Sequence, residues 1–292
     1  MGFRAVCIES RAKCSYSGGY LVVTTGDVTT KIHLSEISTL TFGTTQVYVS
    51  GYLMAELAQN KIPVSFCNEK RFPEAVSLPL HGSYNCLEGV ENQLSWSLPS
   101  KKRLWQKVIR HKILKQAEVL ALLEIPAGEQ RLKQYAEEVR SGDPTNREAT
   151  AAALYFASLF GADFTRDSEN WINASLNYGY SVLLSQVSRE LISHGYLTHV
   201  GICHKGRNNH WNFACDLMEP FRPFIDYLIV SSGLDDFNKP MRCLLIDSLS
   251  HLVNYRDGTY KMASVVKMYV KDCVDCLDRK LSADDIEIYE VQ

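Results

Sequence analysis

The spacing of apolar residues changes once along the chain, and this change limits the fold more than any other feature. Up to about residue 80, apolar and polar residues alternate with a period of two, as in the segments 28–34 and 39–42. From about Pro99 the period is close to 3.6, which is the repeat of an amphipathic helix. Strands followed by helices predict an α+β chain and argue against a parallel α/β sheet.

Local signals refine this division into segments. The turns Ser17-Gly18-Gly19 and Thr25-Gly26-Asp27 contain glycines that tolerate a positive φ, so the strands on either side are predicted to pair antiparallel. A short helix is predicted between Ser50-Gly51 and Lys61-Ile62-Pro63, before a strand at 64–67. At roughly 150 residues per domain, a chain of 292 residues predicts two domains. We place a β-rich domain at 1–80, a linker at 81–100 and a helical domain at 101–292, with helices after the first long one at 128–139, 145–160, 170–194, 209–230, 239–253 and 262–281.

Membrane, secreted and zinc-binding classes are not favoured by the sequence. No window approaches the ~20 consecutive apolar residues of a membrane span, and the N-terminus lacks the basic-then-apolar layout of a secretory signal. We therefore expect a cytoplasmic protein without a membrane partner. The nine cysteines are irregularly spaced, as expected for thiols in a reducing compartment. Cys273 and Cys276 form one close pair without a second pair to complete a zinc site, so we predict buried helix thiols.

The formal net charge of −2 conceals an uneven distribution of charge along the chain. No acidic residue lies between Glu91 and Glu118, whereas acidic residues gather near the C-terminus. The basic stretch favours a surface for a polyanion, and the alternative is a helix face that is only solvated. Its cations are Lys101, Lys102, Arg103, Lys107, Arg110, Lys112 and Lys115.

Three polar segments carry side chains that could perform chemistry, and each also has a structural explanation. Thr145 and Glu148 have the spacing of a capping box, so a helix cap is the favoured interpretation there. The loop 201–209 contains His204, which is more often a solvated side chain than a metal ligand. Asp216 and Glu219 share a helix face, where two carboxylates repel unless a cation or proton lies between them. For this last pair, a functional site and an acidic surface are equally supported.

Four motifs then occur in order along the helical part of the chain. Together they resemble the CRISPR-associated spacer-acquisition integrases, the DNA-integrating subunits of the adaptation complex, and most closely those of type II systems. The resemblance extends over the whole chain and implies an antiparallel β-sandwich-like N-terminal domain followed by a larger all-helical catalytic domain. The motifs are Asn146-Arg147-Glu148-Ala149, Asn173-Ala174-Ser175-Leu176-Asn177-Tyr178-Gly179-Tyr180, Gly201-Ile202-Cys203-His204 and Asp216-Leu217-Met218-Glu219-Pro220-Phe221-Arg222-Pro223.

The resemblance implies a catalytic metal site. In the family, a glutamate, a histidine and a further carboxylate bind a divalent metal, and they match Glu148, His204 and Glu219. A mixed set of carboxylates and one imidazole suits Mg²⁺ or Mn²⁺. Asp216 matches a carboxylate that supports the site, and we predict that it orients His204 or pairs with Arg222 instead of binding the metal.

Cations near this site are expected to contact DNA. Lys205 and Arg207 follow His204 and are candidates to hold phosphates. Arg222 is an equal candidate for such a contact and for an internal salt bridge to Asp216 or Glu219. The basic helix is the expected surface for the DNA backbone, through Lys101, Lys102, Arg103, Lys107 and Arg110.

The family's reaction is transesterification, in which the 3′-hydroxyl of a protospacer DNA attacks a phosphodiester at the edge of a CRISPR repeat. One phosphodiester replaces another, so no ATP is required, and the sequence contains no Gly-x-x-x-x-Gly-Lys-Ser/Thr loop. The implied partners are double-stranded protospacer DNA, CRISPR leader-repeat DNA, a second copy of the chain in a homodimer, a small ferredoxin-like adaptation protein, and the RNA-guided nuclease of the same system.

Two other functions remain open from the sequence. A metal-dependent endonuclease would use the same residues with water as the nucleophile, and the sequence does not separate hydrolysis from transfer. A non-catalytic scaffold that only holds DNA ends is the other. The intact set Glu148, His204 and Glu219 argues against the scaffold, because a binding subunit gains nothing from carboxylates that repel DNA.

Overall fold

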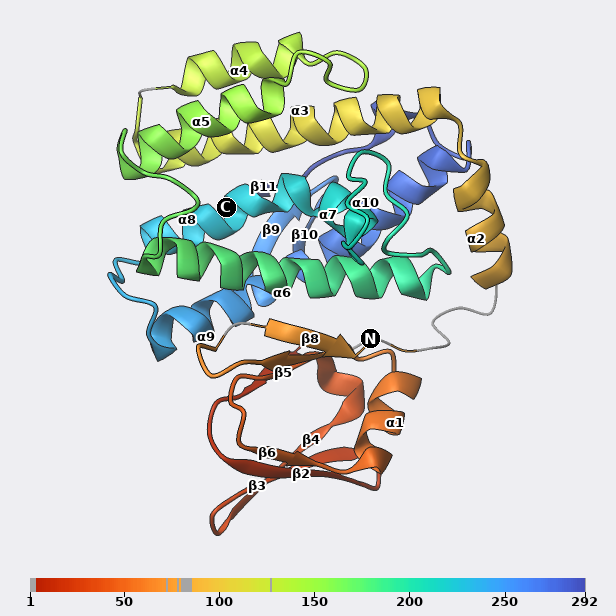
Figure 1. Ribbon diagram of the computed structural model, residues 1–292, viewed down its shortest axis with the longest axis vertical. Helices are drawn as coiled ribbons and strands as arrows, with labels where there is room; N and C mark the ends of the chain where they lie inside the picture. The colour runs from red at the N-terminus through yellow and green to blue at the C-terminus, as the bar shows by residue number, and fades with distance from the viewer. Residues whose placement is uncertain (1–3, 72, 78, 80–85, 127, 292) are drawn as a thin grey trace.

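A strand-rich N-terminal region and a larger helical region lie at opposite ends of the molecule's long axis (Figure 1). The computed structural model describes residues 4–71, 73–77, 79, 86–126 and 128–291. The order of strands and helices confirms the predicted fold class. The domain boundaries at 80 and 101 stay a prediction.

Two four-stranded sheets form the N-terminal region. The predicted hairpins are present, because β2 (Ala12–Ser17) pairs antiparallel with β3 (Tyr20–Thr25), which pairs antiparallel with β4 (Val28–His33). The sheets are mixed and not wholly antiparallel, since β1–β5, β5–β7 and β2–β6 are parallel pairs. Parallel pairing needs a long crossover, which α1 (Gly51–Gln59) helps to supply before β7. The first sheet has the order β1 (Arg4–Ile8), β5 (Ile37–Phe42), β7 (Val64–Cys67), β8 (Pro73–Ser77), and the second has the order β4, β3, β2, β6 (Val47–Val49).

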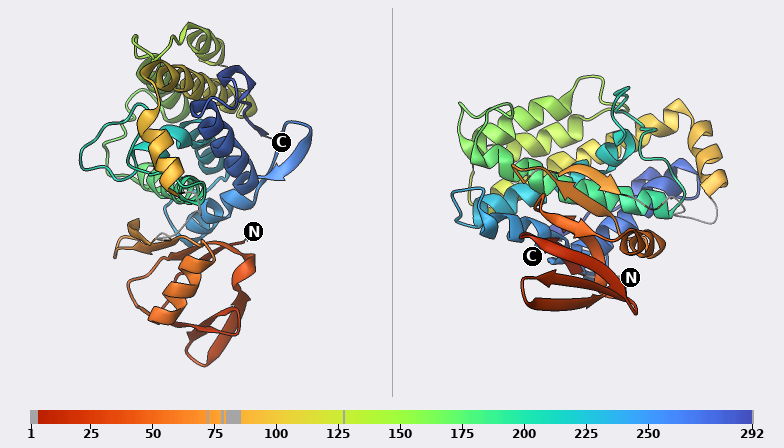
Figure 2. Two further views of the ribbon diagram at one scale, coloured as in Figure 1. Left: turned by 90° about the vertical axis from the view of Figure 1, so that its right-hand side faces the viewer. Right: turned by 60° about the horizontal axis from the view of Figure 1, so that its bottom comes forward.

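The helical region is built around two long helices that cross the molecule, α3 and α6 (Figures 1 and 2). The pair α4 and α5 covers the outer side of α3, while α6 faces the first N-terminal sheet (Figure 1). The helices of this region are α2 (Cys86–Ser95), α3 (Leu98–Leu122), α4 (Glu129–Glu138), α5 (Arg147–Phe160), α6 (Trp171–Ser193), α7 (Asn212–Met218), α8 (Arg222–Ser231), α9 (Lys239–Asp247) and α10 (Met262–Leu277), with 3₁₀ turns η2 (Glu219–Phe221), η3 (Ser248–Ser250) and η4 (Ala283–Asp285). The 3₁₀ turn η1 (Leu34–Glu36) lies between β4 and β5 of the N-terminal region.

The segment predicted as a linker, 81–100, contains α2 and the start of α3, and its residues 81–85 lie outside the described residues. Tertiary contacts fix α2 against the end of α6. The Gln93 amide donates to the carbonyls of Leu197 and Val200 at 2.9 Å each. A Cβ at Gly89 would lie 2.5 Å from the carbonyl oxygen of Gly195, so only glycine allows this packing. The helix therefore depends on partners that are remote in sequence.

A small sheet interrupts the region that was expected to be all-helical. The strands β9 (Leu252–Tyr255) and β10 (Gly258–Lys261) form a hairpin, and β11 (Glu290–Val291) pairs with β9. The helix predicted over 239–253 instead ends with α9 and η3. Val253 and Tyr255 are buried while their neighbours Leu252 and Asn254 are exposed, which is the period-two pattern of a strand. That run is too short to stand out from the helices around it.

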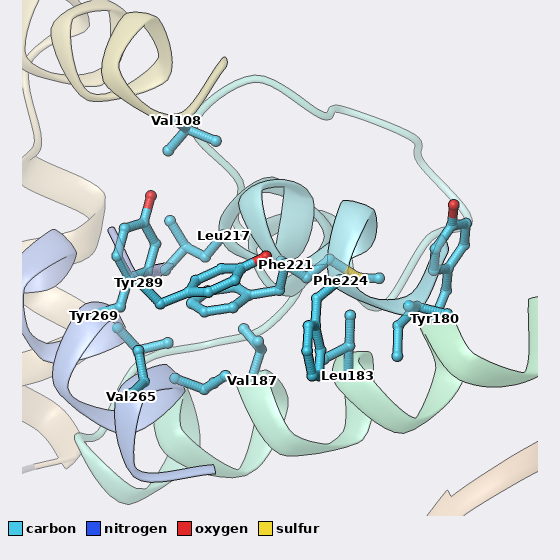
Figure 3. Close-up of a cluster of buried hydrophobic side chains, with 14 of the residues drawn as sticks. Val108, Tyr180, Leu183, Val187, Leu217, Phe221, Phe224, Val265, Tyr269 and Tyr289 are labelled. Carbon is cyan, nitrogen blue, oxygen red and sulfur yellow. The ribbon is translucent and has the colours of Figure 1, made fainter. Parts of the chain in front are cut away.

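A buried aromatic cluster fixes η2 inside the helical core (Figure 3). Phe221 stacks on Tyr289 with ring centroids 5.4 Å apart and meets Tyr269 edge-on at 5.2 Å. The Tyr289 hydroxyl also donates to the carbonyl of Pro220 at 3.2 Å. The cluster holds the turn that begins with Glu219. Within the described residues, no helix is both long and apolar enough to cross a membrane.

Candidate active site

The predicted metal ligands lie on three elements that converge beside the middle of α3. Glu148 is in the first turn of α5, Glu219 opens η2, and His204 lies in the loop between α6 and α7. Lys112 of α3 connects the two glutamates, with its Nζ 2.7 Å from Glu148 Oε1 and 2.6 Å from Glu219 Oε2. On the same helix, the ring of Trp105 meets the His204 ring edge-on, with centroids 5.8 Å apart.

The start of α5 presents Glu148 to this site. Asp143 accepts hydrogen bonds from the backbone N–H groups of Arg147 at 2.9 Å and Glu148 at 3.0 Å, and Asn146 is the N-cap. The predicted capping box at Thr145 is therefore wrong, because the short side chains of Asp143 and Asn146 occupy the capping positions. Since the cap does not need the Glu148 carboxylate, that side chain extends to Lys112.

Lys112 was counted in the basic stretch but not among the site residues. Its side chain is only 11% exposed, so its charge needs carboxylate partners. Burial lowers the pKa of Lys112, but the charges of Glu219 and Glu148 outweigh that effect and raise it. Its position could have been found from the sequence, because Trp105, Val108 and Lys112 follow the i, i+3, i+7 spacing of one helix face. A lysine on an otherwise apolar stripe predicts a buried charge pair.

Glu219 is the most deeply buried of the three metal-ligand candidates, with a side chain 4% exposed. Burial raises its pKa, but the charges of Arg222 and Lys112 dominate and lower the pKa of Glu219 to about 2. Arg222 Nε lies 2.9 Å from Glu219 Oε1, which is the internal salt bridge that the sequence left as one of two options. The Arg222 guanidinium also lies over the ring of Tyr180, 4.6 Å from its centroid. Glu219 is therefore ionised and held between two cations.

Asp216 shapes the loop that carries His204. Its carboxylate, which is fully buried, accepts hydrogen bonds from the backbone N–H groups of Ile202, Cys203 and His204 at 2.6, 3.1 and 3.0 Å. It also lies 2.7 Å from His204 Nδ1. Because both Asp216 oxygens already accept from backbone N–H groups, we assign the donor in this contact to His204 Nδ1–H, which leaves Nε2 available. Of the two options for Asp216, the structure shows the contact with His204.

This loop tolerates no side chain at Gly201. A Cβ there would lie 2.6 Å from the His204 carbonyl oxygen and 2.7 Å from Asp216 Oδ2. The hydrogen bond to Asp216 raises the pKa of His204, although burial opposes the shift, and the charges of Glu219 and Glu148 act in the same direction as Asp216. Gly201 and Asp216 together therefore fix the backbone and the ring of His204.

The predicted DNA-binding cations fall on different faces of α3. Lys101 lies four residues before Trp105 and therefore on the face that meets His204. Lys102 packs against Gly142, just before α5. Nine residues, or about 2.5 turns, separate Arg103 from Lys112, which places Arg103 on the opposite face. Lys107 and Arg110 share that opposite face, and Lys107 Nζ donates to the Asp284 carbonyl at 3.1 Å.

Lys205 and Arg207 are exposed on the loop that follows His204. Neither has an ion pair with any residue that the structure describes. Their charges are therefore available to a ligand beside the imidazole. Lys115, by contrast, pairs with Glu118 and lies 4.8 Å from the centre of the Tyr289 ring, so this member of the basic stretch has a structural role.

The donor set fits a divalent cation. In the part of the chain that the structure describes, no three His, Cys, Asp or Glu side chains form a ready-made metal cluster. The Lys112 ammonium instead stands between Glu148 and Glu219 as a monovalent cation. Glu219 Oε2 is buried and its contact is this ammonium, at 2.6 Å, so a divalent cation that replaced the ammonium would meet the oxygen already in position. Two carboxylates and an available imidazole nitrogen are donors that Mn²⁺ and Mg²⁺ accept.

Comparisons with known proteins agree with the geometry. Residues 6–235 match the family described as "CRISPR associated protein Cas1". The CRISPR-associated endonuclease Cas1 of Neisseria meningitidis is 36% identical over 230 residues, which are 79% of this chain and 76% of the relative. A second relative, CRISPR-associated endonuclease Cas1 2 of Saccharolobus solfataricus, is 22% identical over 79% of this chain and 75% of its own length.

Similar folds occur among solved structures. A casposase bound to its integration product has a TM-score of 0.73 at 19% identity, over 97% of this chain and 93% of that one. A CAS1 protein from Thermotoga maritima has a TM-score of 0.74 at 16% identity, over 94% of this chain and 96% of its own. A chain of a Cas6-RT-Cas1–Cas2 complex reaches 0.76 at 17% identity, over 97% of this chain and 36% of that one. At these identities the similarity concerns the fold.

Proposed function

The chain belongs to the CRISPR-associated protein Cas1 family, and from this membership we propose that it is a metal-dependent DNA integrase of CRISPR adaptation. It joins the 3′-hydroxyl ends of double-stranded protospacer DNA to the CRISPR repeat. The observation that carries the proposal is the contact of one ammonium group with both Glu148 and Glu219. A buried and a partly buried carboxylate that converge on one cation, with an imidazole on the neighbouring loop, form a site for chemistry on phosphodiesters.

Each residue of the site has a distinct task. Glu148, Glu219 and His204 Nε2 would hold Mg²⁺ or Mn²⁺, which would supply Lewis-acid activation of the attacking hydroxyl and the scissile phosphate. Asp216 holds Nδ1–H and so fixes the tautomer and the ring orientation of His204. Arg222 keeps Glu219 ionised.

Cations around the carboxylates would position the DNA. Lys205 and Arg207 lie on the loop beside His204 and would bind phosphates of the strand that enters the site. Lys101 and Lys102 would bind the backbone along the near face of α3, and the cations of the opposite face would contact DNA further from the reacting end. The positive charge offsets the repulsion between the acidic site and its polyanionic substrate.

The reaction conserves the number of phosphodiester bonds. The 3′ oxygen of the protospacer forms a bond to phosphorus at the repeat edge, while the bond from that phosphorus to the repeat's own 3′ oxygen breaks. The attacking hydroxyl gives up its proton and the leaving oxygen takes one up. No other bond energy is needed, so the site requires no nucleotide triphosphate.

An endonuclease that acts by hydrolysis is the second candidate function. The observation in its favour is that the relatives from Neisseria meningitidis and Saccharolobus solfataricus carry the name endonuclease. Water in place of the 3′-hydroxyl would cut the strand with the same residues. The two functions differ in product, since hydrolysis leaves a nicked repeat and an unjoined protospacer.

The proposed partners follow from the same membership. Some neighbours in fold are subunits of a Cas6-RT-Cas1–Cas2 complex, which supports assembly with a small ferredoxin-like adaptation protein. We also propose a homodimer through the β-rich region, association with leader-repeat DNA, and contact with the RNA-guided nuclease of the same system.

The deciding experiment mixes the protein with its ferredoxin-like partner, a labelled duplex and a supercoiled repeat plasmid, with and without Mn²⁺. We expect labelled plasmid only when Mn²⁺ is present. Glu148→Gln should abolish joining and retain duplex binding, whereas Glu137→Gln, an exposed glutamate of α4, should behave as the wild type. Nicked plasmid without label would instead establish the endonuclease. Equal joining by Glu148→Gln and the wild type would place the chemistry elsewhere.

A further inference from the structure

The start of α3 lies near the end of α10 at one end of the helical region (Figures 1 and 2). Residues of both segments line a pocket of about 590 Å³. Its polar lining comes from Ser100 and Arg103 of α3, Arg279 and Lys280 after α10, and Ser282 and Asp285 beyond them. The pocket does not include Glu148, His204 or Glu219, and Arg103 lies on the face of α3 opposite Lys112. It is therefore separate from the catalytic centre.

The lining of this pocket carries a net positive charge. Its lining holds three cations and one carboxylate, Asp285. Among the residues that the structure describes, Arg103 and Arg279 have no ion pair and no side-chain hydrogen bond. Lys280 pairs with Asp278 at 3.2 Å, but that carboxylate also accepts hydrogen bonds from Trp96 and Tyr196. Two arginines that line one pocket without an ion pair favour an anion as their ligand.

The backbone at Arg279 allows its side chain to be tested separately from the fold. Arg279 has φ 62, a left-handed conformation, at the position that follows the C-cap Asp278 of α10. Its N–H donates to the Cys276 carbonyl at 3.1 Å, and the Lys280 N–H donates to the Asp275 carbonyl at 2.7 Å, which is the hydrogen-bond pattern that usually ends on glycine. Glycine fits this backbone with less strain than arginine, so the charge of Arg279 can be removed there without cost to the fold.

We infer that this pocket binds a phosphate group of the DNA backbone at a distance from the catalytic carboxylates. Arginine guanidinium groups match phosphate oxygens in shape and charge, and the hydroxyls of Ser100 and Ser282 can donate to the same group. The position at one end of α3 suits DNA that continues past the reacting end. The assignment of the phosphate to DNA rests on the proposed function, whereas the anion site itself does not.

Two variants separate binding from folding. Arg279→Gly removes the charge and relieves the left-handed strain, so we expect its melting temperature to rise by about 2–4 °C. Its affinity for a labelled 30-base-pair duplex should nevertheless fall. The double variant Arg103→Gln and Arg279→Gln should flatten the slope of log K against log salt by about 0.9 for each lost phosphate contact. Lys133→Gln, which removes one exposed charge from α4, serves as the control for net charge.

A second arm identifies the source of the phosphate. Inorganic phosphate at 10 mM is added to the wild type and to the double variant in a melting scan. A flattened slope in duplex binding, with the control unchanged, supports the DNA site. Stabilisation of the wild type alone by inorganic phosphate, with an unchanged slope, overturns the DNA assignment in favour of a free phosphate. A more stable Arg279→Gly that binds duplex and phosphate like the wild type overturns the anion site.

The joining assay runs in parallel and keeps the two proposals apart. Wild-type protein that binds duplex but fails to join it contradicts the integrase proposal. In that case the salt slopes of duplex binding still test whether the pocket binds a phosphate. Wild-type protein that joins normally, with no slope change in the double variant, contradicts the pocket and leaves the integrase proposal intact.

Discussion

The two faces of α3 carry the same kinds of cation in opposite surroundings. On one face, Lys112 is 11% exposed and contacts two carboxylates within 2.7 Å. On the other face, Arg103 and Arg110 are exposed and have no ion pair with any residue that the structure describes. A buried charge has lost its hydration and depends on its partners, whereas an exposed charge remains free to meet a ligand. The first face should therefore control stability and metal binding, and the second should control the affinity for DNA.

Replacement of Lys112 should give the largest effect on folding. Lys112→Met leaves Glu148 and Glu219 facing each other without the shared ammonium, so we expect a loss of about 3–5 kcal/mol in the free energy of unfolding. Urea unfolding at neutral pH without metal measures this loss. Arg110→Met, on the exposed face, is the matched control and should change stability by less than about 0.5 kcal/mol.

The same variant tests whether this site accepts a divalent cation. With the ammonium removed, Mn²⁺ has less competition for the two carboxylates. We therefore expect Mn²⁺ to raise the melting temperature of Lys112→Met more than that of the wild type. Equal shifts in the two proteins would mean that Lys112 does not compete with a metal, and a stable Lys112→Met without metal would remove the contrast between the faces.

Asp226, a buried residue of α8, gives a prediction for how the free energy of unfolding depends on pH. Burial raises the pKa of Asp226 to about 6. Its carboxyl accepts a hydrogen bond from the Tyr180 hydroxyl at 2.6 Å, and the Arg222 guanidinium lies over the ring of that tyrosine. Between the ordinary value of 3.8 and about 6, the native state holds a proton that the unfolded state has released. Stability therefore falls as the pH rises through this window, and the cost persists above it.

Asp226→Asn should remove that pH-dependent cost. We expect it to gain about 2–3 kcal/mol relative to the wild type at pH 8 and little at pH 4, because the shift is about two pKa units. Unfolding by urea at pH 4, 5, 6 and 8 measures the difference. If the free energies of unfolding of the two proteins changed with pH in parallel, Asp226 would not titrate in this window.

The Asp216→Asn variant should weaken metal binding, with an effect smaller than that of the Lys112 and Asp226 variants and larger than that of the Arg110 variant. The amide can accept at one oxygen only, so it cannot satisfy the donors of residues 202–204 and His204 Nδ1 together. We expect a ~10- to 100-fold loss of Mn²⁺ affinity, measured by calorimetry, and recovery of joining at high Mn²⁺. Joining that stays near zero at saturating metal would make Asp216 as essential as Glu148. Asp275→Asn, a surface partner of Lys271, is the control.

Periodicity predicted the order of strands and helices because it records which side of each element is buried. It also placed the ends of α5 and α6 within a few residues, and glycines marked the turns at Gly18 and Gly26. The hairpin at β9 and β10 was missed, since four-residue strands give too short a pattern. The helix α2 was also missed, because it depends on contacts with residues 195–200, which are remote in the sequence.

The candidate site was predicted in its residue types but not in its pairings. The ordered motifs pointed to Glu148, His204 and Glu219, and the i, i+3 repulsion between Asp216 and Glu219 indicated that each needs a partner. No local rule shows that Asp216 turns to His204 while Glu219 turns to Lys112, because those partners are set by the packing of α3 against η2. The division of the basic stretch between two faces also follows from this packing.

The smallest expected effect on folding, and the sharpest test of the exposed face, concerns Arg110 and Lys107. Arg110 is exposed, whereas Lys107 is half-buried and its Nζ already donates to the Asp284 carbonyl at 3.1 Å. Arg110→Gln should leave the free energy of unfolding within about 0.5 kcal/mol of the wild type. It should also reduce the salt slope of duplex binding by about 0.9. Lys107→Gln should reduce the slope by less, because part of its charge is directed at the protein.

Fluorescence anisotropy of a labelled duplex over a range of salt concentrations measures both slopes, with Lys133→Gln of α4 as the control for net charge. The order of the two variants is the informative result. A larger effect for Lys107 than for Arg110 would show that DNA displaces the segment around Asp284, so exposure in the free protein would not rank the contacts. If both variants kept the salt slope of the wild type, the DNA would contact only the face of α3 that carries Lys101 and Trp105. The exposed face would then contribute nothing to DNA binding, and the division of tasks between the two faces would be wrong.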